Sequence, residues 1–93
     1  MLILLFAVIN MGVFAQTTVT GTVVDKTGEP LIGVSVLEKD TSTRCVTNID
    51  GEFSLAVRNA NDAVLQFSYI GMDSQEVALA GRTRIEVVMQ ESS

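Results

Sequence analysis

The 93-residue sequence has no histidine and a single cysteine, and each shortage excludes a kind of chemistry. Without histidine, the chain cannot build a Ser-His-Asp triad, a Cys-His nucleophile pair or one of the usual histidine-containing zinc sites. The lone Cys45 has no partner for an intramolecular disulfide. It stands in a strand-like run, so we interpret it as a small buried apolar residue rather than as a reactive thiol.

Positive charge is also scarce, because six Lys and Arg stand against eleven Asp and Glu, giving a net charge of −5. This acidic balance argues against a nucleic-acid partner. Acidic pairs such as Glu38 and Asp40 fit solvated charges on alternating strands better than acid–base catalysts. We therefore predict no catalytic residue, no metal site and no cofactor, and we do not expect an enzyme.

The first 15 residues, MLILLFAVINMGVFA, carry no charge. The segment is shorter than the ~20 residues that cross a bilayer as a helix. Ala15, with Val13 two positions before it, fits a signal-peptidase site, and cleavage there would leave Gln16 as the new N-terminus. The alternative is a hydrophobic strand or helix of the domain itself. We predict a signal peptide over residues 1–15 and one small domain over residues 16–93.

The rest of the chain is rich in β-branched residues, since Val, Ile and Thr supply 24 of residues 16–93. No window shows sustained helical spacing, and short alternating runs are cut by turn residues every 8–12 positions, which is typical of a sandwich. The predicted strands are Thr18–Asp25, Gly33–Lys39, Arg44–Thr47, Glu52–Val57, Ala63–Tyr69, Asp73–Leu79 and Arg82–Gln90.

Alternation within three of these strands predicts a shared apolar core. Its expected members are Phe53, Leu55, Val57, Leu65, Phe67, Tyr69, Ile85, Val87 and Met89. We expect the Tyr69 hydroxyl to be hydrogen-bonded inside this core rather than to serve in sugar stacking. The sequence thus favours an all-β domain.

Two segments between strands resemble ligand-binding loops but lack the residues that such loops require. Residues 48–52 superficially resemble a calcium loop, but the twelfth position from Asn48 is Asn59 and not Glu. We instead predict a turn in which Asp50 accepts backbone N–H bonds and Gly51 has a positive φ. Residues 26–30 contain one Gly and precede no helix, so they form a turn and not a phosphate loop.

Gly21 and Gly33 lie inside strand-like runs. Glycine at such positions marks a bulge or a close approach of another group to the backbone. We expect one or the other at both positions.

Several motifs together resemble a known family. Residues 19–25, VTGTVVD, and 28–34, GEPLIGV, are followed by TNIDGEFSL over 47–55 and FSYIG over 67–71. This order closely resembles the carboxypeptidase-regulatory-like (transthyretin-like) domain, in the version at the N-terminus of SusC-like TonB-dependent outer-membrane transporters of Bacteroidetes. Departures are small: Asn48 replaces a commoner Asp, Met72 an aromatic residue, and Arg44-Cys45 a frequent Gly-Thr pair.

The resemblance implies a seven-stranded Ig-like or prealbumin-like β-sandwich that is exported to the periplasmic side of the outer membrane. It further implies a non-catalytic accessory domain in a nutrient transporter, with glycans as the favoured nutrient, that acts in protein contact or spacing. Its implied partners are the plug and barrel of the transporter, the periplasmic TonB machinery and, through the full-length transporter, a SusD-like lipoprotein. The alternative is an accessory or adhesion sandwich of another secreted protein, such as a peptidase. An edge strand such as Thr18–Asp25 would offer a partner a site for β-augmentation.

Cleavage after Ala15 is the first testable expectation. Mass spectrometry of the protein recovered from the periplasmic side should show Gln16, free or cyclised, as the first residue. Recovery of a chain that still begins at Met1 would contradict the signal-peptide interpretation.

Overall fold

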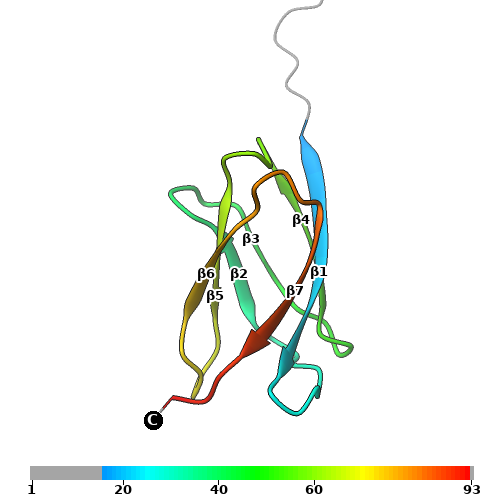
Figure 1. Cartoon of the computed structure of the whole chain (residues 1–93), viewed down its shortest axis with the longest axis vertical. Coiled ribbons are helices and arrows are strands. Elements are labelled where there is room, and N and C mark those ends of the chain that lie inside the picture. Colours follow the sequence, from blue (N-terminus) through cyan, green and yellow to red (C-terminus); the bar gives the residue numbers. More distant parts are fainter. Residues whose placement is uncertain (1–15, 93) are drawn as a thin grey trace, which may run out of the picture.

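The computed structural model describes residues 16–92, which fold into seven strands in two facing sheets (Figure 1). The predicted signal peptide, residues 1–15, lies outside the described residues. The strands are β1 (Thr17–Asp25), β2 (Ser35–Glu38), β3 (Arg44–Val46), β4 (Glu52–Val57), β5 (Val64–Ser68), β6 (Gln75–Ala78) and β7 (Arg84–Met89). The predicted seven-stranded β-sandwich is confirmed. Most strands are shorter than predicted, because the residues at their predicted ends lie in the connecting turns and loops.

The first sheet has the order β4-β1-β7, with β1 antiparallel to β4 and parallel to β7. The expectation that Thr18–Asp25 forms an edge strand is therefore wrong. β1 pairs with β4 over Thr17–Thr22 and with β7 over Thr20–Asp25, so it is the central strand of this sheet and not an edge strand. Its alternation, with Val19, Gly21 and Val23 buried between half-exposed or exposed threonines, suits a central strand with one solvated face.

The second sheet has the order β3-β2-β5-β6, and all its pairs are antiparallel. Side-chain and loop contacts join the two sheets at their edges. The Gln75 side chain of β6 donates a hydrogen bond to the carbonyl of Val88 in β7, at 2.9 Å. On the other side, the backbone N–H of Asn48, after β3, donates to the carbonyl of Glu52 in β4 at 2.9 Å. Both sides of the sandwich are thereby partly closed.

The hydrophobic core lies between the sheets and contains eight of the nine predicted members. Phe53 and Phe67, one from each sheet, meet edge to face with ring centroids 5.6 Å apart. Tyr69 is the exception, because it follows β5 and is only half-buried, packed against the core. The buried hydrophobic residues are Val19, Val23, Val34, Val36, Phe53, Leu55, Val57, Ala60, Ala63, Leu65, Phe67, Leu79, Ile85, Val87 and Met89.

Gly21 marks a close approach, as its position in a strand predicted. A Cβ built there would overlap the backbone oxygen of Ile85 and lie 2.7 Å from the Phe53 ring. Because no side chain can occupy this point, the ring of Phe53 packs directly on the backbone of β1. The central strand and the core aromatic pair thus depend on one glycine.

The two described ends of the chain lie at opposite ends of the sandwich (Figure 1). β1 starts at one end, and β7 runs parallel to it, so the chain leaves at the other end. The β1–β2, β3–β4 and β5–β6 connections share that exit end. The β2–β3, β4–β5 and β6–β7 connections lie at the entry end (Figure 1).

Truncation of Phe53 tests the core. Phe53→Ala should lower the free energy of unfolding by about 3–5 kcal/mol, because it removes the ring over Gly21 and leaves a cavity. Ser54→Ala changes the next residue, which is exposed, and should stay within about 0.5 kcal/mol of the parent. Urea unfolding of residues 16–93 measures both. Equal effects of the two substitutions would contradict the assigned core.

Candidate functional site

Thr47 connects two loops at the exit end. Its side chain is nearly fully buried, and its hydroxyl donates to the carbonyl of Leu31 at 2.6 Å while accepting from the N–H of Val34 at 2.9 Å. The Thr47 backbone bonds to Val34 and Gly33 as well. Thr47, at the start of the β3–β4 turn, thus provides hydrogen-bond partners for polar backbone groups of the β1–β2 connection. These bonds fix the two loops relative to each other.

The β3–β4 turn is confirmed, but its predicted acceptor is wrong. The side-chain oxygen of Asn48, not Asp50, accepts backbone N–H bonds, from Asp50 and Glu52 at 2.9 Å each. An Asn or Asp at the first position of such a turn reaches the backbone two residues on, whereas Asp50 is exposed at the tip. Gly51 has φ +73°, as predicted, and its Cα faces the carbonyl of Val23.

The β1–β2 connection begins with a second side-chain-capped turn. A carboxylate oxygen of Asp25 accepts hydrogen bonds from the Thr27 hydroxyl at 2.6 Å, the Thr27 N–H at 2.8 Å and the Glu29 N–H at 3.0 Å. The Thr27 hydroxyl first, and then these backbone groups, hold the pKa of Asp25 below its ordinary value. Residues 26–30 are therefore the turn that the sequence predicted. Gly33 lies in a later turn of the same connection, with φ +86°, and not in a strand.

The chain end is held against the β5–β6 connection. The N–H of Asp73 donates to the carbonyl of Gln90 at 2.8 Å, and the N–H of Ser92 donates to the carbonyl of Gly71 at 3.0 Å. Met72 and Glu91 form an isolated β-bridge between these bonds. The path of the chain out of the domain is thus fixed among the exit-end loops.

These four segments form the surface that we call the exit face: residues 26–34, 47–51, 69–74 and 90–92. Three isoleucines of its loops are exposed to solvent, Ile32 by 53%, Ile49 by 74% and Ile70 by 88%. The loops meet at Gly33, whose N–H donates to the carbonyl of Thr47 and whose Cα faces the Tyr69 ring. Three exposed isoleucines on neighbouring loops at one end, two of which are hydrogen-bonded to each other through Thr47, are an apolar feature of the kind that marks interaction sites.

The charges of the exit face are mainly negative. It carries one cation, Lys26, and four carboxylates, so its formal charge is −3; the carboxylates are Glu29, Asp50, Asp73 and Glu91. The loops of the entry end, residues 39–43, 58–63 and 79–83, carry three cations and two carboxylates, a formal charge of +1. The net acidity of the domain is therefore unevenly distributed along its long axis.

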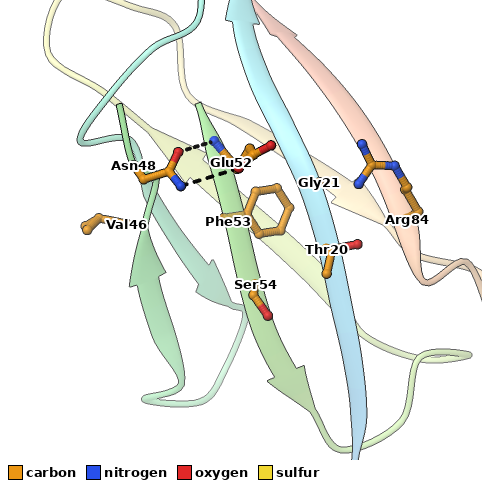
Figure 2. A pocket seen from close by; sticks show the side chains of 8 residues that line it. All are labelled: Thr20, Gly21, Val46, Asn48, Glu52, Phe53, Ser54 and Arg84. Carbon is orange, nitrogen blue, oxygen red and sulfur yellow. Dashed lines mark hydrogen bonds between the residues drawn. The ribbon is translucent and has the colours of Figure 1, made fainter. Parts of the chain in front are cut away.

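A hollow of about 480 Å³ lies over the outer face of the first sheet, beside β3 (Figure 2). Small residues, Thr20, Gly21 and Ser54, line its middle, while Arg84 stands on one side and Glu52 on the other. Glu52 is held by Asn48 through its backbone N–H and, at 3.5 Å, its carboxylate. The hollow is open and lined by few charged groups, which suits contact with another surface better than enclosure of a small molecule.

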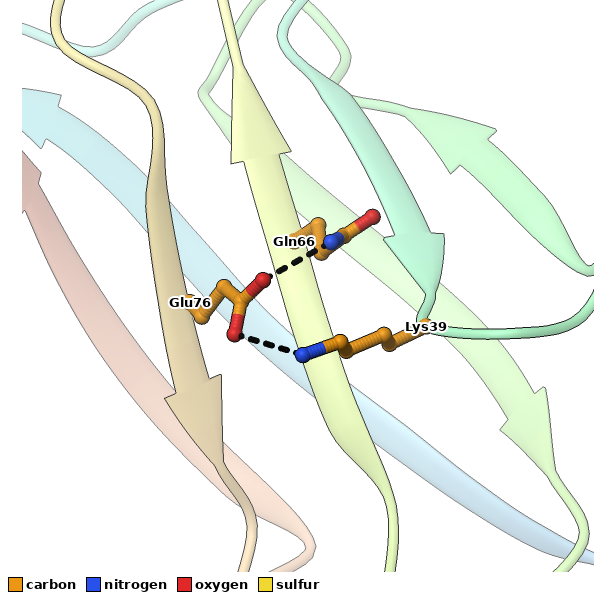
Figure 3. Close-up of polar contacts among 3 residues, drawn as sticks. All are labelled: Lys39, Gln66 and Glu76. Carbon is orange, nitrogen blue, oxygen red and sulfur yellow. Dashed lines mark hydrogen bonds and ion pairs between the residues drawn. The ribbon is translucent and has the colours of Figure 1, made fainter.

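The outer face of the second sheet carries a polar cluster (Figure 3). Glu76 accepts hydrogen bonds from the Gln66 side chain at 2.8 Å and from Lys39 Nζ at 3.2 Å. These two bonds, with Gln66 the larger effect, lower the pKa of Glu76. All three side chains are at least partly exposed to solvent, so the cluster is a surface ion pair that adds little stability.

Three individual expectations have different outcomes. Cys45 is half-buried and packs against the core, and its burial raises the pKa of its thiol, in agreement with an apolar role. Asp40 is exposed, as expected, in a turn with φ +66°. Glu38 is not a solvated surface charge, since the residue is only 8% exposed. It occupies the last position of β2 on the same side as Val34 and Val36, so strand alternation turns it inward.

Within residues 16–92, no group of three or more Asp, Glu and Cys side chains is placed to hold a metal ion. Over the same part of the chain, no helix is long and apolar enough to cross a membrane.

The fold is that of a β-sandwich module whose exit face exposes both isoleucine side chains and carboxylates. Crystal structures of type II cohesin-X-dockerin complexes from Acetivibrio cellulolyticus contain a chain of this fold. Two such structures match with TM-scores of 0.66 and 0.63 at 21% and 20% identity, covering 81% and 78% of this chain and 58% and 56% of theirs. At this identity the likeness concerns the fold alone.

Sequence comparison identifies the family. Residues 19–93 match the CarboxypepD_reg-like domain, and the chain belongs to this family. It is 38% identical to a TonB-dependent receptor of Formosa agariphila over 91% of its length, and 37% identical to TonB-dependent receptor SusC of Bacteroides thetaiotaomicron over 83%. The chain spans only 8% of the length of each of these relatives. The resemblance inferred from the motifs is confirmed.

The bridging role of Thr47 can be tested by removing its hydroxyl. Thr47→Val keeps the side-chain shape but leaves the Val34 N–H and the Leu31 carbonyl without this partner, so it should cost about 1–3 kcal/mol of unfolding free energy. Thr18→Val makes the same change at an exposed position of β1 and should stay within about 0.5 kcal/mol. Urea unfolding of both variants decides the matter, and a neutral Thr47→Val would refute the bridging role.

Proposed function

We propose that this chain is the N-terminal, periplasmic accessory domain of a SusC-like TonB-dependent receptor that imports nutrients, with glycans as the favoured class. In this role the domain catalyses no reaction. It acts by contact with other proteins or as a spacer between the plug of the receptor and the periplasmic TonB machinery. A SusD-like lipoprotein would be a partner of the full-length receptor rather than of this domain.

The family relationship carries the proposal. Identities of 36–38% to three TonB-dependent receptors extend over at least 81% of this chain, so the whole domain is shared and not one motif. Each relative is far longer than this chain, which matches 8% of its length. A domain of this kind therefore accompanies a much larger receptor in those proteins.

The geometry of the sandwich supports a connecting role. The described chain enters at one end and leaves at the other, so the domain sets a separation between whatever precedes and follows it (Figure 1). The hydrogen bonds from Asp73 to Gln90 and from Ser92 to Gly71 fix the direction in which the chain leaves the sandwich. An uncharged apolar leader in residues 1–15 is consistent with export.

The sequence of the gene beyond the codon for Ser93 tests the proposal. The reading frame should continue for several hundred residues, with strands of ~9–11 residues that alternate apolar outward and polar inward, the pattern of an outer-membrane barrel. A short apolar segment and a plug should come before these strands. A stop codon directly after Ser93 would contradict the transporter assignment, and a peptidase domain in that place would favour an accessory module of a secreted enzyme.

A further inference from the structure

We propose that the exit face is a docking surface for the part of the receptor that follows Ser93, and that this part presents an apolar surface bearing Lys or Arg. The inference rests on the function proposed above and adds to it a surface, an occupant and a chemistry. Three observations carry it: the exposed isoleucines, the negative charge around them and the fixed path of the chain end.

The isoleucines are presented on a braced surface. Thr47 connects the loop of Ile32 to the loop of Ile49 by hydrogen bonds, and the loop of Ile70 is hydrogen-bonded to the chain end at Gln90 and Ser92. The backbone of each isoleucine loop is therefore ordered before any partner arrives. Preorganised loops lose less conformational entropy on binding than free ones, which favours a specific contact.

Charge distinguishes among the possible occupants. The exit face has a formal charge of −3, so the same face of a second copy would be repelled, as would a membrane rich in anionic lipid. An occupant that pairs with the four carboxylates must carry positive charge, and one that covers the isoleucines must also be apolar. The entry end of another copy, at +1, is a weaker candidate for the same chemistry.

The position of the chain end favours the following part of the receptor as the partner of the exit face. The β-bridge between Met72 and Glu91, and the bond from Ser92 to Gly71, place the last described residues within the exit face itself. Any polypeptide that continues from Ser93 starts beside the isoleucines. Its tether gives it a high effective concentration there, so even a weak contact is populated in the receptor.

Photo-cross-linking in the full-length receptor, in native outer membranes, tests this inference. The photoreactive residue p-benzoylphenylalanine replaces Ile49 or Ile70 in separate variants, and Ser42 in the control. Ser42 is an exposed residue in the β2–β3 connection at the entry end. Mass spectrometry should locate cross-links from positions 49 and 70 in receptor residues beyond Ser93, and none of these from position 42.

Charge reversal tests the chemistry of the contact. Asp50→Lys combined with Asp73→Lys should reduce the yield of these cross-links about three- to tenfold, because two favourable charge contacts become repulsive. Asp62→Lys combined with Glu86→Lys makes the same change in net charge at exposed positions outside the exit face and should leave the yield unchanged. Equal yields in the two double variants would overturn the electrostatic part of the proposal.

The result separates this inference from the proposed function. A receptor that reaches the outer membrane at the parental level but gives no cross-links beyond Ser93 would overturn the docking inference alone. Cross-links to a second copy or to another protein would overturn it in the same way. Failure of the proposed function shows earlier and independently, as a reading frame that encodes no barrel.

Discussion

The packing of the Phe53 ring against Gly21 is the contact on which the rest of the sandwich depends. It brings the side chain of β4 onto the backbone of the central strand, where any Cβ would overlap Ile85. From there the ring reaches Phe67 in the opposite sheet. The Phe53–Phe67 pair thus joins the two sheets within the shared core.

Core and loops are stabilised by different interactions, which leaves the exit face free to serve another purpose. The sheets depend on apolar contacts, whereas two of the exit-face loops are fixed by backbone N–H groups that donate to the side chains of Thr47, Asn48 and Asp25, and the third by backbone bonds to the chain end. Because hydrogen bonds hold the loops, the core packs without Ile32, Ile49 and Ile70. Their exposure is compatible with a stable fold and costs it little.

The sequence was sufficient for the strands and most of the core, because period-two alternation reports burial directly. It was insufficient where pairing or direction matters. Alternation in Thr18–Asp25 cannot distinguish an edge strand from a central one, since both have one buried face. The alternation of Val34 and Val36 also predicts that Glu38 points inward, but its carboxylate was expected to be in solvent.

The sequence was also insufficient in the loops. In the turn at residues 48–51, Asn48 and Asp50 are both plausible acceptors, and only backbone geometry decides between them. The exit face was missed because its isoleucines lie far apart in the chain.

The uneven distribution of charge between the two ends of the domain bears on its orientation, because the chain enters at one end and leaves at the other. If the acidic exit face contacts the body of the receptor, as proposed, the opposite end, with its excess of Lys and Arg, faces away from that contact (Figure 1). Removal of the leader would add a positive α-amino group at that end unless Gln16 cyclises. A partner in the periplasm would then meet a weakly basic surface, while the receptor body meets an acidic one. Under the proposed function, two ends of opposite formal charge would favour one orientation of the domain between its two neighbours.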